Sequence, residues 1–184
     1  EGEGERESVC LEEYRSKYQR WLNCGQIETA LYYAERIYAE TQFEGDLLAV
    51  AYCIMQMGSP GLVVMFLSAH PIATTYPPLV ALYAQALILT KDYDAAHTLL
   101  QGDPRTPPLL DPFDEASLCV LRGRLQLLRK NPERAVYWYG RALRHEPGCV
   151  SAAVELKSKE LIGTTDEAVL ESTLIRGLRQ KRQE

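Results

Sequence analysis

The chain has 184 residues, of which 46% are hydrophobic and 24% charged, and its formal net charge is −5. This composition supports a folded domain with a substantial core, while the negative charge gives no reason to expect nucleic acid as a partner. The longest apolar stretch, Leu47 to Met55, is too short to span a bilayer, so we expect no membrane contact.

Residues 1–10 are acidic and Gly-rich, unlike a signal peptide, which is basic and then apolar. We expect a disordered leader over 1–10 and a helical domain over 11–184. The five cysteines are widely spaced and form no CxxC pair, which argues against a disulfide framework. Reduced thiols in a reducing, intracellular compartment are therefore expected.

Helical apolar patterns along the chain are broken four times, and a small or branched residue follows each break at the same offset. These residues are Ala30, Val63, Ala96 and Ala135, and Ala168 continues the series at intervals of 33, 33, 39 and 33 residues. The period is close to the 34 residues of a tetratricopeptide (TPR) repeat. The longer third interval coincides with a Pro-rich stretch, 102–112, which we interpret as a loop between repeats.

The sequence therefore predicts an all-α fold, a TPR-type solenoid of about five helical hairpins in a right-handed superhelix. The predicted repeats cover residues 11–42, 44–70, 77–103, 115–147 and 149–180. The short run 72–75 is flanked by prolines and is expected to form a loop.

The fourth repeat shows the packing pattern most clearly. Gly123 and Ala135 mark the crossing of its two helices, because only small residues allow such close approach. Arg122 and Gln126 occupy positions where the repeat usually has a large apolar residue. The predicted packing residues of all repeats are Ala30, Ala96, Gly123, Ala135, Tyr139, Ala142 and Pro147.

The inner helices of repeats two to four are predicted to line a concave groove. The set is mostly apolar and lacks the Lys and Asn cluster that would grip a terminal carboxylate. An open apolar groove marks a protein interface, and an amphipathic helix is the ligand that fits it. The predicted groove residues are Leu48, Tyr52, Met55, Ala81, Gln85, Ile88, Leu89, Val120, Arg124 and Leu127.

The first predicted helix, about 11–23, carries a stripe of large side chains, Tyr14, Tyr18, Trp21 and Leu22. Aromatic residues of this kind are enriched at interface hot spots. If this helix lies in the groove of a second copy, the result is a reciprocal homodimer. The alternative is that the stripe packs within its own hairpin, as stripes at helical spacing usually do.

No catalytic motif, phosphate-binding loop or metal-ligand spacing is found, and the three histidines are far apart in sequence. We therefore expect no enzyme activity, no metal and no cofactor. The fourth repeat is locally basic, which would suit docking of an acidic partner or, alternatively, a solvated helical face.

Several segments resemble one known family. The run 34–40, Ala-Glu-Arg-Ile-Tyr-Ala-Glu, is similar to a run near the start of cell division cycle protein twenty-seven, a TPR subunit of the anaphase-promoting complex. Segments 48–53 and 83–86 match in the same order. Segment 118–154 resembles a later repeat of this family, and cell division cycle protein sixteen, a sister scaffold, fits 118–143 about as well.

The resemblance implies a homodimerising scaffold subunit of a mitotic ubiquitin ligase, located in nucleus and cytoplasm. Its implied partners are a second copy of itself and other subunits of that complex. The alternative function is a monomeric TPR adaptor that binds a partner peptide or helix in its groove.

Overall fold

The computed structural model describes residues 2–101, 111–159 and 161. The chain divides into two compact units, Glu1–Thr90 and Lys91–Glu184, which are considered separately below. Over the described residues the chain is entirely helical and contains no strand, which confirms the predicted all-α class.

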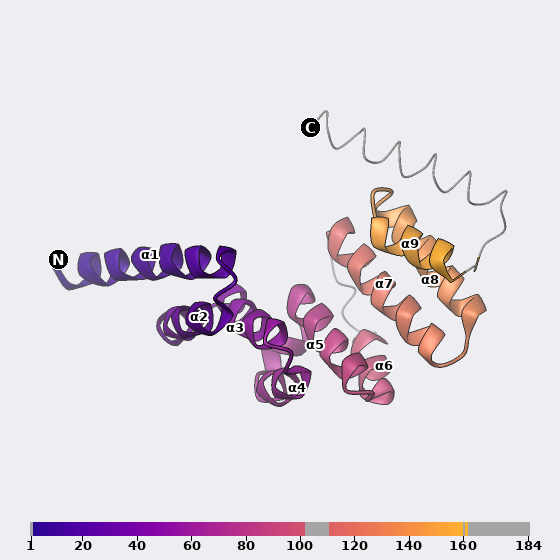
Figure 1. The fold of residues 1–184 in the computed structure, drawn as a ribbon, viewed down its shortest axis with the longest axis horizontal. Helices are drawn as coiled ribbons and strands as arrows, with labels where there is room; N and C mark the ends of the chain where they lie inside the picture. The colour runs from indigo at the N-terminus through magenta and orange to yellow at the C-terminus, as the bar shows by residue number, and fades with distance from the viewer. Residues whose placement is uncertain (1, 102–110, 160, 162–184) are drawn as a thin grey trace. The chain divides into compact units, whose positions relative to one another are not determined.

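The first unit contains five α-helices and one 3-10 helix, in indigo to magenta in Figure 1. They are α1 (Gly2–Asn23), α2 (Ile27–Thr41), α3 (Glu44–Gln56), α4 (Pro60–Ser68), η1 (Pro71–Thr74) and α5 (Pro77–Leu89). Consecutive helices pack together, and α3 also contacts α5. Leu47, Ala51, Val63, Leu67 and Leu79 are fully or almost fully buried in the core that these helices enclose.

The described part of the second unit consists of α6 (Tyr93–Gln101), α7 (Pro112–Leu128), α8 (Pro132–His145) and α9 (Val150–Ser158). Helices α7 and α8 form the most extensive contact of the unit, and α9 packs on α8. Their shared core is centred on Ala135, Tyr139, Ala142 and Ala152. Small residues on three helices let the backbones approach closely.

The breaks detected in the sequence are tight turns with one left-handed residue each. Such a residue ends a helix by turning its last amides back onto free carbonyls, as in the Schellman motif. Glycine suits this conformation because it has no Cβ. The left-handed residues at the four breaks are Gly25 (φ 72°), Gly58 (φ 75°), Lys91 (φ 66°) and Lys130 (φ 60°).

Two boundary predictions are wrong. Helix α1 begins at Gly2, so residues 2–10 are helical rather than a disordered leader. Glutamate is a good helix former, and acidic residues are favourable near a helix N-terminus, which outweighs the cost of two glycines. The run 72–75 was expected to be a loop, but Pro71–Thr74 forms a 3-10 turn, because proline fits the first turn of a helix.

Two other predictions lie outside the described residues. They are the Pro-rich loop, over residues 102–110, and the second helix of the fifth hairpin, beyond residue 161.

Candidate functional site

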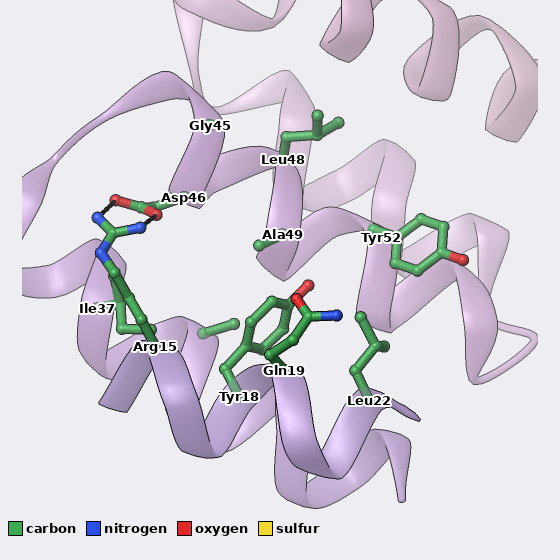
Figure 2. Close-up of a pocket in the computed structure, with 11 residues that line it drawn as sticks. Arg15, Tyr18, Gln19, Leu22, Ile37, Gly45, Asp46, Leu48, Ala49 and Tyr52 are labelled. Atoms are coloured by element: carbon green, nitrogen blue, oxygen red, sulfur yellow. Dashed lines mark hydrogen bonds and ion pairs between the residues drawn. The ribbon is translucent and has the colours of Figure 1, made fainter. Parts of the chain in front are cut away.

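The first unit contains a hollow of about 570 Å³ between α1 and α3. Figure 2 shows α1 side chains on one side and α3 side chains on the other. Helix α2 contributes Ala34 and Ile37, which are buried. The lining residues are Arg15, Tyr18, Gln19, Leu22, Ala34, Ile37, Gly45, Asp46, Leu48, Ala49 and Tyr52, and we call this surface the α1–α3 groove.

One end of the α1–α3 groove holds an ion pair. Arg15 of α1 donates two parallel hydrogen bonds to the carboxylate of Asp46 in the first turn of α3, at 2.9 and 2.8 Å (Figure 2). The Thr41 hydroxyl, at the end of α2, donates a third at 2.7 Å. Asp46 is buried, with 6% of the residue exposed, and these donors replace the water that its charge would otherwise need.

The middle of the groove is apolar. Leu22, Leu48 and Ala49 line it, and Tyr52 is 41% exposed. Burial, followed by the neighbouring Cys53 thiol, raises the pKa of Tyr18 to about 12, so its hydroxyl stays neutral at physiological pH. The groove therefore offers apolar surface and one charge pair whose partners are already matched.

The predicted aromatic stripe on α1 is divided between two environments. The Tyr14 ring packs against Tyr33 of α2, with ring centroids 5.9 Å apart, as the within-hairpin alternative requires. Tyr18 and Leu22 line the α1–α3 groove instead. Trp21 is 39% exposed.

Of the predicted groove residues in the first unit, Leu48 and Tyr52 do line the α1–α3 groove. Met55, Ala81 and Ile88 are half-buried elsewhere on the unit, whereas Gln85 and Leu89 are exposed. What sequence analysis did not predict is that α1 of the same chain forms the opposite wall. The pairing of Arg15 with Asp46 was also missed, because no local spacing connects residues 31 positions apart.

In the second unit, the predicted placement of Val120 on an open groove is wrong. Val120 is 5% exposed and belongs to the core cluster, because α8 and α9 pack over that face of α7. Leu127 is partly buried against the same core. The Arg124 guanidinium donates to Glu155 of α9 at 2.8 Å. A continuous groove through repeats two to four stays a prediction.

The predicted packing residues lie at helix contacts. Ala30, Ala96, Gly123, Ala135, Tyr139 and Ala142 are buried and Pro147 is half-buried. The closest approach is at Gly123, where an added Cβ would lie 2.5 Å from Cε1 of Tyr139. A side chain at position 123 would overlap the Tyr139 ring, so glycine suits this position.

The polar residue Arg122, which departs from the repeat pattern, has an internal role. Its Nε donates to the Leu100 carbonyl oxygen at 2.9 Å, near the C-terminal end of α6. Its Nη1 lies 3.3 Å from Glu115, and its guanidinium lies 5.1 Å from the Trp138 ring centroid. Arg122 thus satisfies an end carbonyl of one helix and stacks on another.

Most of the basic residues of the fourth repeat are paired within the second unit. Arg122 and Arg141 flank Glu115, Arg124 meets Glu155, and Arg129 lies 2.6 Å from Asp94. These contacts favour the solvated, internally paired face over a docking patch.

Among the described residues, no three His, Cys, Asp or Glu side chains gather in a group that could hold a metal ion. None of the described helices is long and apolar enough to cross a membrane.

Stacked helical hairpins of this length, joined by left-handed turns and packed through small residues, define a TPR-type helical repeat protein. Residues 23–103 match the model of the family described as anaphase-promoting complex, cyclosome, subunit 3. The chain is thus similar to this family from the end of α1 to the end of the third predicted repeat. A sequence comparison with curated proteins finds no significant match.

Solved structures support the same fold. A chain of the APC/C hetero-tetramer Cut9-Hcn1 superposes with a TM-score of 0.78 at 24% identity. The match covers 89% of the present chain and 33% of that one, so the present chain spans about a third of its length. MamA from Desulfovibrio magneticus RS-1 (residues 41 to the end) gives 0.59 at 17% identity, covering 95% and 96%. At these identities the likeness concerns the fold.

Proposed function

We propose that this chain is a protein-interaction scaffold that self-associates through the α1–α3 groove and acts as a subunit of the anaphase-promoting complex in cell-cycle control. The observation that supports self-association is the α1–α3 groove. Its apolar surface is open, and its charged carboxylate is already matched by Arg15 and Thr41. Such a surface is suited to an apolar helix face and not to a charged peptide end.

Helix α1 of a second copy has the exposed apolar surface that the groove is suited to bind. Helix α1 has 22 residues and its hairpin partner α2 has 15, so seven residues of α1 have no counterpart on α2. At the rise of an α-helix they extend about 10 Å. Helix α1 also presents Trp21, which is 39% exposed, beside Tyr18 and Leu22, which line the open groove. Two copies that pack this side of α1 against each other would bury these side chains reciprocally, with each α1 kept in its own chain.

The self-association is tested by sedimentation equilibrium with Tyr52→Glu. We expect the wild-type chain to be a dimer and the variant to have a dissociation constant at least about 30-fold higher, because a buried hot-spot aromatic contributes roughly 2 kcal/mol. Tyr52 is already 41% exposed, so the variant should retain its helix content by circular dichroism.

Tyr137→Glu is the matched control, since Tyr137 is 55% exposed and is not among the residues that line the groove. A wild-type chain that remains monomeric at high concentration would favour the second candidate, a monomeric adaptor whose groove takes a partner helix. The same groove chemistry supports that candidate, so the oligomeric state decides between them.

The place in the anaphase-promoting complex is supported by the family match over residues 23–103 and by the likeness to the Cut9-Hcn1 assembly. From the same similarity we propose the nucleus and cytoplasm as the location. Co-purification of tagged chain from dividing cells, read by mass spectrometry, should recover the subunits of the complex in fixed ratio. Recovery of none of them would exclude this role.

A further inference from the structure

The buried carboxylate of Asp46 does not cap the free amides of its own helix. It lies in the first turn of α3, where an acidic side chain often caps free amides, but α3 has no side-chain cap hydrogen bond. Its oxygens are instead bound by Arg15 of α1 and Thr41 at the end of α2. Three helices therefore converge on one carboxylate, and the Arg15–Asp46 pair connects the two walls of the α1–α3 groove.

Arg15 lies on the face of α1 that lines the groove. Tyr18, Gln19 and Leu22 follow it at i+3, i+4 and i+7, on one face of the helix. A two-point guanidinium–carboxylate contact restricts both the distance and the direction of the arginine. Holding Arg15 against Asp46 thereby restricts the rotation of α1 about its axis, and that rotation decides which side chains line the groove.

We propose that Arg15 is the positioning residue of the α1–α3 groove: through Asp46 and Thr41 it holds α1 in the orientation that forms the groove wall. The link to binding rests on the self-association proposed above. The effect of Arg15 on the position of α1 does not depend on self-association, because the Arg15–Asp46 ion pair lies within one chain.

The variants are Arg15→Gln, which removes the charge, and Arg15→Lys, which keeps the charge but loses the two-point geometry. Glu13→Gln is the matched control, because it breaks the Glu13–Lys17 pair (2.6 Å) on the same helix, away from the groove. All are made in the Tyr52→Glu background, studied at a concentration at which that variant is monomeric, and also in the wild-type background.

In the monomeric background, amide hydrogen exchange is measured over residues 14–23. Arg15→Gln should raise exchange there by at least about tenfold, since release of α1 is a local opening, without changing α7 and α8. Glu13→Gln should leave the exchange rates of α1 close to those of the parent variant. Unchanged exchange in Arg15→Gln would overturn the positioning role, whether or not the chain self-associates.

In the wild-type background, Arg15→Lys should keep its melting temperature within about 2 °C while its dimer dissociation constant rises at least about fivefold, because geometry is lost and charge is kept. If Arg15 acted on stability alone, the melting temperature would fall as the dimer dissociation constant rises. That result would overturn the link to binding. If the wild-type chain never self-associates, the proposed function fails, and the exchange measurement still decides what Arg15 does to α1.

Discussion

At the scale of single residues, the contact between Gly123 and Tyr139 determines how closely α7 and α8 pack. Tyr139 is fully buried, and its ring lies where a side chain at position 123 would begin. Burial raises the pKa of the Tyr139 phenol well above its usual value, so the ring stays neutral. The ring belongs to a close-packed buried cluster with Ala135, Ala142 and Ala152, which leaves it little room to move aside.

We therefore predict that Gly123→Ala lowers the free energy of unfolding by about 1–3 kcal/mol, the usual cost of overpacking a core. Gly140→Ala is the control, because nothing lies within 4 Å of its added Cβ. In the interior of α8 that change should raise stability by about 0.5–1 kcal/mol. Urea denaturation measures both, and equal effects would contradict the steric argument.

At the scale of helices, the same hydrogen-bonded turn follows α1, α3 and α7. After α7, the Lys130 amide donates to the Leu127 carbonyl and the Asn131 amide to the Gln126 carbonyl, both at 2.9 Å. The turn after α3 has the same pair of bonds around Gly58. At Lys91 and Lys130 a side chain with a Cβ takes the conformation that glycine adopts without steric cost.

We predict that Lys130→Gly raises the free energy of unfolding by up to about 1 kcal/mol, the relief of left-handed strain less the added entropy of an unfolded glycine. Lys130→Ala should give no such gain, because alanine has the same Cβ. Thermal unfolding of the two variants separates conformational strain from loss of the lysine charge. A gain in both would assign the effect to charge.

Repeats, turns and close contacts could be predicted from the sequence because they depend on local spacing and residue size. Gly123, Ala135 and the four breaks are examples. Arg15 with Asp46, and Arg122 with Leu100, could not be, because each joins elements whose approach is set by tertiary packing. The helix at 2–10 was missed because its glycines were given more weight than its glutamates.

At the scale of the whole chain, charge is distributed unevenly. Residues 1–46 carry 11 acidic and 5 basic residues, residues 91–184 carry 14 and 15, and residues 47–90 carry none. Exposed apolar side chains lie within that neutral stretch, including Tyr52, Leu62, Met65 and Leu89. A surface without charged residues contributes little electrostatic free energy to binding.

We therefore predict that the dimer dissociation constant changes less than about threefold between 50 and 500 mM NaCl, since screening acts on exposed charges. Sedimentation equilibrium at the two salt concentrations measures this directly. A steep weakening with salt would assign the contact to exposed charged residues outside the α1–α3 groove.

The Trp138 ring has a guanidinium close to it from Arg122, at 5.1 Å, and another from Arg141, at 5.5 Å. Trp21, the other tryptophan of the chain, is on α1 in the first unit and 39% exposed. Each unit thus carries one tryptophan, and the two indole rings have different polar neighbours. Replacing either with phenylalanine leaves an optical probe of a single half, so that melting of the two halves can be recorded separately without an attached dye.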